Sequence, residues 1–172
     1  MHPAYSVILF TTASGAGYGL LIWLAVWLMR EPIGGDAAFG PVSMVLALGL
    51  ITVGLLSSTF HLGRPARAWR ALLQWRTSWL SREGVLAVAT YVPAALLAGV
   101  WIFWGGRPAW LIAPLAILTI VLALATVWCT GMIYQSLPTI RAWSHPLVAR
   151  IYLALAIASG GVLALLVLRL FG

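Results

Sequence analysis

The sequence predicts an all-α protein, a polytopic transmembrane helix bundle with about five spans and a short interfacial amphipathic helix between spans two and three. Two observations lead to this prediction. Of the 172 residues, 63% are hydrophobic and only 8% are charged, with a mean hydropathy of +1.03, whereas about a quarter of the residues are charged in soluble domains. Five apolar runs are also long enough to cross a bilayer, since about 20 helical residues cover its hydrocarbon core.

Short polar segments separate the five runs. The N-terminus before the first run has no positive charge, which favours a true span over a cleaved signal peptide. Segments rich in glycine and proline at 31–36 and 105–108 end the first and third runs. The runs cover about Tyr5–Met29, Pro41–Phe60, Val85–Trp104, Trp110–Tyr134 and Leu147–Leu168. Without an internal repeat or a linker, residues 1–172 are expected to form a single transmembrane helical domain.

The segment between the second and third runs has a helical pattern of its own. Arg67, Arg70 and Gln74 fall at positions i, i+3 and i+7. The residues that tend to the other face are Ala68, Trp69, Leu72, Trp75 and Trp79. This pattern predicts an amphipathic helix in the membrane interface. Arg67, Arg70 and Arg76 are expected to dock anionic lipid or a partner subunit.

The arginines indicate an orientation. All ten basic residues are arginine, and an odd number of spans puts the two termini on opposite sides of the membrane. The side of the N-terminus has Arg64, Arg67, Arg70, Arg76, Arg82, Arg141 and Arg150, and the other side has Arg30, Arg107 and Arg169. The positive-inside tendency places the richer side in the cytoplasm. Because these arginines lie in short loops between apolar runs, the net charge of +7 does not indicate a nucleic-acid partner.

Two titratable residues stand where charged groups are costly unless they serve a function. His61 ends the second run, and an imidazole there can exchange a proton near neutral pH. Capping of helix carbonyls explains His61 equally well. Glu83 opens the third run, where capping together with Ser78 or Ser81 would be the ordinary explanation. However, Glu83 is the only acid on this side of the membrane, and it is expected at the same depth as His61.

A histidine and a carboxylate at the end of a pocket open to lipid suit a quinone, whose reduction or oxidation moves two protons with two electrons. His61 and Glu83 are therefore the candidate catalytic pair, with quinone or quinol as the bound substrate. Arg64 or Arg82 could stabilise developing negative charge. Tyr134, at the end of the fourth run on the same side, is a further candidate for quinone binding, and its interfacial position also has an ordinary explanation.

Other motifs give weaker signals. Cys129 is the only cysteine, so an iron–sulfur cluster or a zinc site must belong to another chain. A haem between two histidines has little support, because His2 and His145 do not lie within a run at a matched depth. Gly15 and Gly19 form a Gly-x-x-x-Gly motif, which predicts close helix packing.

Several motifs together resemble the membrane-anchor subunits of dimethyl sulfoxide reductase-type molybdoenzymes, the DmsC family. They are Met1–Ile8, Thr12–Gly19, Phe60–Pro65 with Arg67–Trp69, Arg76–Glu83 and Tyr134–Ser136. The resemblance implies an anchor in the bacterial cytoplasmic membrane that contains no metal itself. The resemblance also implies that this anchor exchanges electrons between quinone and an iron–sulfur subunit, which passes them to or from a molybdopterin subunit. The histidine and glutamate associated with quinol binding in that family correspond to His61 and Glu83.

The chain departs from the family pattern in two respects. Members typically have about eight spans, so five indicate a truncated or naturally shortened form. Anchors of dimethyl sulfoxide reductase present this face to the periplasm, whereas the arginine count favours the cytoplasm. The opening Met-His-Pro-Ala is closer to the anchors of cytoplasm-facing sulfite dehydrogenases (SoeC-like). The substrate and the direction of electron flow stay open.

Three other functions compete with a quinone-reactive anchor. A purely structural anchor would use the basic loop only to dock a partner. A small transporter would place charged groups at mid-bilayer depth, and the interiors of the five runs have none. A membrane hydrolase could use Ser57 or Ser58 with His61, but no oxyanion motif is recognisable.

Overall fold

The computed structural model describes residues 5–30, 39–59, 65–104 and 109–171, without the side chains of 65–68, 71 and 109. The described residues form the long helices α1 (Tyr5–Arg30), α2 (Phe39–Thr59), α3 (Trp79–Trp104), α4 (Ala109–Gln135) and α5 (Val148–Phe171), and the short helix η1 (Pro65–Gln74). Each of the five long helices is long and apolar enough to cross a membrane. The predicted all-α, five-span fold class is confirmed, and the chain is a multi-pass membrane protein.

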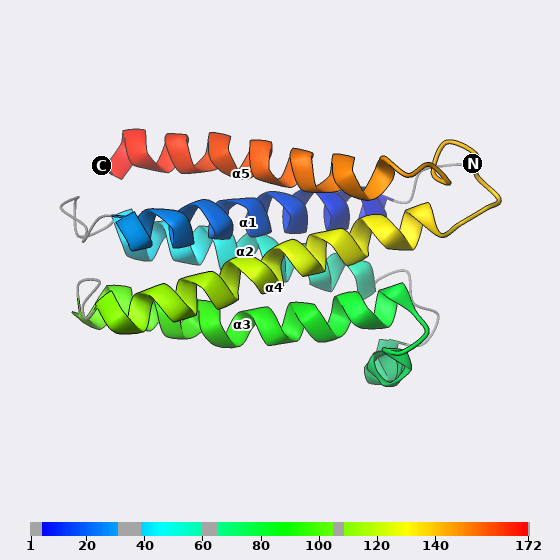
Figure 1. Cartoon of the computed structure of the whole chain (residues 1–172), viewed down its shortest axis with the longest axis horizontal. Coiled ribbons are helices and arrows are strands. Elements are labelled where there is room, and N and C mark those ends of the chain that lie inside the picture. The colour runs from blue at the N-terminus through cyan, green and yellow to red at the C-terminus, as the bar shows by residue number, and fades with distance from the viewer. Residues whose placement is uncertain (1–4, 31–38, 60–64, 105–108, 172) are drawn as a thin grey trace.

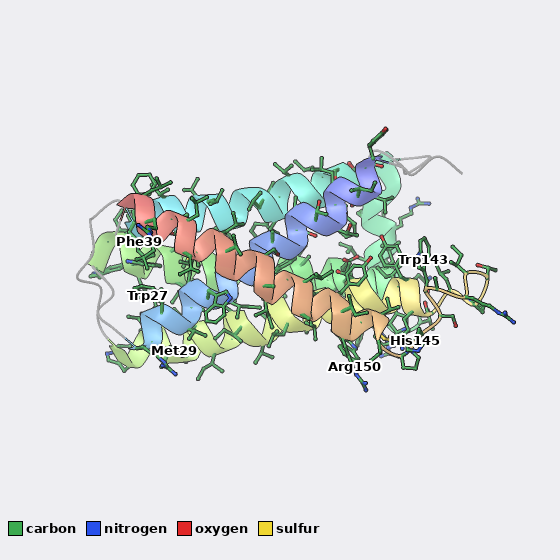
Figure 2. All side chains as sticks on the ribbon, turned by 90° about the horizontal axis from the view of Figure 1, so that it is seen from above. Trp27, Met29, Phe39, Trp143, His145 and Arg150 are labelled. Atoms are coloured by element: carbon green, nitrogen blue, oxygen red, sulfur yellow. The ribbon has the colours of Figure 1, made fainter. Side chains whose placement is uncertain are left out.

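The long helices run side by side along the longest axis of the molecule, with η1 across one end beside the start of α3 (Figure 1). Helix α1 is central, because it packs against α2, α4 and α5, whereas α3 packs mainly against α4. We call the end with η1, the start of α1 and residues 136–147 the η1 end. Trp143, His145 and Arg150 lie at this end, and Trp27, Met29 and Phe39 lie at the opposite end (Figure 2).

Helices α1 and α5 cross at backbone contact. A Cβ atom added to Gly19 would lie 1.8 Å from the carbonyl oxygen of Ala156, and one added to Gly160 would lie 2.0 Å from the carbonyl carbon of Gly19. The indole Nε1–H of Trp23 donates a hydrogen bond to the carbonyl oxygen of Ile157 at 3.0 Å across the same interface. The predicted close packing is therefore confirmed for Gly19.

The same prediction is wrong for Gly15. A Cβ atom added there would meet no atom within 4 Å, so no helix approaches this position closely. The two glycines are one turn apart on α1, but the crossing with α5 falls at Gly19. Only one residue of the motif therefore makes the close approach.

Helix α3 begins at Trp79, six residues before the predicted third run. The hydroxyl of Ser78 accepts a hydrogen bond from the backbone N–H of Ser81 at 3.4 Å, which identifies Ser78 as the N-cap. Glu83 therefore lies inside the first turns of the helix and not at its start. The predicted short helix is also present, although η1 has 3₁₀ and not α geometry.

Helix η1 contacts α3 through one apolar side chain. Leu72 is half-buried against α3, where a Cβ atom added to Gly84 would lie 2.6 Å from its Cδ2 atom. Arg70 and Gln74 are exposed, and so are Trp69 and other apolar side chains. An exposed apolar surface next to arginines suits a helix in the membrane interface.

Candidate functional site

The buried carboxyl group of Glu83 is the starting point of the site. Glu83 is one of three acids in the chain. Although a carboxyl group normally faces water, this side chain is only 4% exposed. Helices α3 and α4 are neighbours that run in opposite directions, so the start of α3 lies beside the end of α4. As a result Thr130, near the end of α4, faces Glu83, and its hydroxyl donates a hydrogen bond to the Oε1 atom of Glu83.

A cavity of about 390 Å³ lies between α1, α4 and α5, and Thr130 forms part of its wall. The wall combines apolar and small side chains with several hydroxyl groups. Its lining residues are Thr11, Thr12, Ser14, Gly15, Ala16, Val127, Thr130, Tyr152, Leu155, Ala156 and Ser159. Glu83 is not among them, so its carboxyl is set back from the cavity and meets it through Thr130.

The cavity extends from the surface of the bundle to its interior. Thr12, Leu155 and Ser159 on its rim are exposed, whereas Ser14 and Thr130 are buried. Gly15 lies on the wall, and the space in front of its Cα atom is part of this opening. The cavity therefore connects the exposed surface of α1 and α5 with the buried hydroxyl of Thr130.

The hydroxyl groups on the cavity wall can accept hydrogen bonds from a ligand. Thr12 donates to the carbonyl of Ile8 at 2.7 Å, and Ser159 donates to that of Leu155 at 2.7 Å. Ser14 likewise donates to the carbonyl of Phe10 at 2.6 Å. Since the single hydroxyl hydrogen is used by the helix, the oxygen lone pairs are what the wall offers to a ligand. Such a wall suits an apolar ring with its own O–H groups.

Tyr134 lines a neighbouring cavity of about 330 Å³ at the η1 end. Its ring stacks on that of Tyr152 with centroids 5.4 Å apart and planes at 19°, and it meets the ring of Trp143 edge-on at 5.2 Å. Tyr152 and Thr11 line both cavities. Tyr134 does not itself line the first cavity, but it stacks on Tyr152, which does.

The guanidinium of Arg82 is held by the segment before α3. Its Nε donates to the carbonyl of Trp75 at 3.0 Å and its Nη2 to that of Arg76 at 2.8 Å. The group also lies 4.3 Å from the ring centroid of Trp79. These contacts fix the loop between η1 and α3, and the predicted role of Arg82 in quinone binding stays a prediction.

The predicted docking arginines lie at the η1 end. Arg70 and Arg76 are exposed, and each guanidinium lies over the ring of the preceding tryptophan at 5.4 and 5.6 Å. The side chain of Arg67 is outside the described part. His61 and Arg64 also lie outside the described residues, so the predicted meeting of His61 with Glu83 stays a prediction.

Sequence reasoning missed Thr130 and Tyr152. A signal for Thr130 was present, because Thr119, Thr126 and Thr130 are spaced by seven and four residues along α4. This spacing puts the three hydroxyls on one face of a helix. All three are buried, so a polar stripe on an otherwise apolar span marks the side of α4 that faces the bundle.

Side chains that ligate metals do not cluster in the described part of the chain, where no group of three His, Cys, Asp or Glu side chains is placed to hold a metal ion. Cys129 is buried with a free thiol. The Nδ1 atom of His145 accepts a hydrogen bond from the backbone N–H of Leu147 at 3.2 Å.

Comparison with known proteins identifies the family. Residues 1–171 match the family described as DMSO reductase anchor subunit (DmsC). The chain belongs to the DmsC family. This result confirms the resemblance drawn from the sequence motifs, and it agrees with five apolar helices in the structure.

Three relatives of the chain have curated names. The C subunit of sulfite dehydrogenase from Allochromatium vinosum is 38% identical over 95% of the chain and 54% of its own length. The C subunit of polysulfide reductase from Wolinella succinogenes is 27% identical over 92% of the chain and 55% of its own length. The C subunit of anaerobic dimethyl sulfoxide reductase from Escherichia coli is 26% identical over 81% of the chain and 48% of its own length. The chain thus spans about half the length of these relatives. No solved structure matches it.

Proposed function

We propose that this chain is the quinone-reactive membrane anchor of a molybdopterin oxidoreductase complex in the bacterial cytoplasmic membrane. Quinone or quinol binds in the cavity between α1, α4 and α5 and exchanges electrons with an iron–sulfur subunit docked at the η1 end. That subunit exchanges them in turn with a molybdopterin subunit. Membership of the DmsC family and the names of its bacterial relatives, all subunits of oxidoreductases, support this proposal.

One observation supports the quinone site above all others. Thr130 both lines a cavity that opens toward lipid and hydrogen-bonds the buried carboxyl of Glu83. A quinol headgroup needs an apolar slot for its ring, acceptors for its O–H groups and a group that takes its protons. The cavity offers the first two, and Glu83 behind Thr130 supplies the third.

The other predicted residues keep, in this proposal, the roles expected from the sequence. His61 binds the second quinone oxygen, and Arg64 or Arg82 stabilises negative charge that develops on it. Tyr134 supports the headgroup through the ring of Tyr152, on which it stacks.

The arginines of η1 and of the loop that follows it serve the partner subunit. Arg67, Arg70 and Arg76 dock the iron–sulfur subunit or the anionic lipid next to it. Since Glu83 and Thr130 lie toward the same end, electrons leave the headgroup on the side where this partner sits.

Filling the cavity tests the proposal. Gly15→Leu places a branched side chain in the open space on the wall, whereas Gly49→Leu adds the same side chain on the exposed face of α2, where a Cβ atom also meets nothing within 4 Å. Binding of a short-tailed quinone analogue to the chain in membranes is measured for both variants. Gly15→Leu should weaken binding at least tenfold, and Gly49→Leu should leave it unchanged. Equal affinity in the two variants would show that quinone binds elsewhere or not at all.

A further inference from the structure

We infer that Thr130 relays protons between a quinol in the cavity and the carboxyl of Glu83. The inference depends on the proposed quinone site and adds a residue to it that neither the sequence motifs nor the family assignment indicated. Thr130 is, in the described part of the chain, the residue that both lines the cavity and hydrogen-bonds Glu83. A proton that travels from the cavity to Glu83 therefore meets this hydroxyl first.

The hydrogen bonds of Thr130 suit a relay because its single hydrogen has two acceptors. The hydroxyl oxygen lies within hydrogen-bond distance of Oε1 of Glu83 and, at 3.1 Å, of the carbonyl oxygen of Thr126. When Glu83 is ionised, Thr130 donates to the carboxylate. When Glu83 is protonated, the carboxylic acid donates to Thr130, and Thr130 turns its hydrogen to the carbonyl of Thr126. Both protonation states of Glu83 are thus hydrogen-bonded without movement of either helix.

Protons and electrons balance in this transfer. An O–H bond of the quinol breaks and its proton binds the oxygen of Thr130, while the original hydrogen of Thr130 moves to Oε1 of Glu83. Glu83 then releases this proton to water at the η1 end. One proton leaves the quinol by this route, the proton of the other O–H leaves through the group that binds the second oxygen, and the two electrons pass one at a time to the iron–sulfur acceptor of the partner subunit. Reduction of quinone uses the same route in the opposite direction.

The neighbouring threonines lack this combination of contacts. Thr126 and Thr119 are buried in α4, donate to the carbonyls of Leu122 and Leu115, and do not line the cavity. Thr119 is therefore a matched control, because its replacement by valine removes a buried hydroxyl of the same helix without touching the relay.

The test uses the complex of the chain with its natural partner subunits in membranes. Thr130→Val keeps the shape of the side chain and removes the hydroxyl, Thr130→Ser restores the hydroxyl, and Thr119→Val is the control. Thr130→Val should lower quinol-coupled turnover by about 10²-fold, the lower range for loss of a proton-transfer group, with unchanged affinity for the quinone analogue. Thr130→Ser and Thr119→Val should keep turnover near that of the wild type. If the complex with Thr130→Val does not assemble, the measurement is repeated with Thr130→Ala, which also removes the hydroxyl and has a smaller side chain.

Two readouts separate a relay from a merely structural role. In a Glu83→Gln background, Thr130→Val should cause no further loss, because the two residues act as one unit. The infrared carboxyl band that Glu83→Gln removes should appear when quinol is added to the wild type and be absent from Thr130→Val. Full turnover of Thr130→Val would overturn the relay while the quinone site stands. If the wild type does not bind the quinone analogue, the proposed function fails and the relay fails with it.

Discussion

Replacing Gly19 with alanine should destabilise the bundle where α1 crosses α5. The new Cβ atom would lie 1.8 Å from the carbonyl oxygen of Ala156, although real Cβ contacts are essentially never under 3.0 Å. The atoms it meets belong to the backbone and cannot rotate aside, so the two helices must move apart by at least 1.2 Å to bring this contact to 3.0 Å. Overpacking of this kind costs about 1–3 kcal/mol.

Gly15→Ala is the matched control for this prediction. Both variants gain the same helix propensity, up to about 1 kcal/mol, but the Cβ atom at Gly15 meets nothing within 4 Å. The difference in the free energy of unfolding between the two variants therefore isolates the steric cost. Unfolding by sodium dodecyl sulfate in mixed micelles, followed by circular dichroism, should show Gly19→Ala about 1–3 kcal/mol less stable than Gly15→Ala. Equal stability would refute the backbone contact between α1 and α5.

Three further changes test other parts of the structure. Glu83→Gln keeps the shape of the side chain but removes the proton acceptor, so quinol-coupled turnover should fall by about 10²-fold to 10⁴-fold while affinity for a quinone analogue persists; loss of affinity alone would contradict this role. His61→Ala should abolish quinone-coupled electron flow and leave assembly and the partner's activity with soluble dyes intact, whereas equal loss of both activities would indicate a folding role. Trp23→Phe removes the hydrogen bond to the carbonyl of Ile157 and should lower the free energy of unfolding by about 0.5–1.5 kcal/mol, measured in the same micelles; an unchanged value would mean that this bond adds no stability.

The spans could be predicted from the sequence because the bilayer fixes their length and composition. Four of the five helices begin within about two residues of the predicted runs. The exception is α3, whose first turns contain serine, arginine and glutamate. Hydropathy treats these residues as a loop, but a helix continues beyond the hydrocarbon when its N-cap, here Ser78, and its polar side chains have partners.

The faces of the helices were less predictable than their ends. The spans are apolar all round, so the periodicity of the sequence does not tell which side meets the other helices. Gly15 and Gly19 illustrate this, since the same motif gives one residue in a tight crossing and one beside a cavity. Which glycine makes the contact depends on where α5 crosses, and this is set by tertiary packing.

Only part of the candidate site could be predicted, because the rest also depends on tertiary packing. Glu83 was identified as the only acid expected on its side of the membrane, at the same depth as His61. Its burial inside the bundle is a finding of the structure. Its partner Thr130 was missed because a threonine costs little in a span and is common there. Pairing the two requires the register between α3 and α4, which a single sequence does not contain.

A photoreactive azidoquinone tests most directly whether a quinone headgroup occupies the cavity between α1, α4 and α5. Membranes with the chain are illuminated with the probe, with and without excess unlabelled quinone, and the labelled peptides are mapped. Labels are expected at cavity-lining residues such as Thr12, Thr130 and Ser159, and unlabelled quinone should remove them. Labels spread over lipid-facing positions such as Val45 and Val88, and unaffected by unlabelled quinone, would contradict a quinone site in this cavity.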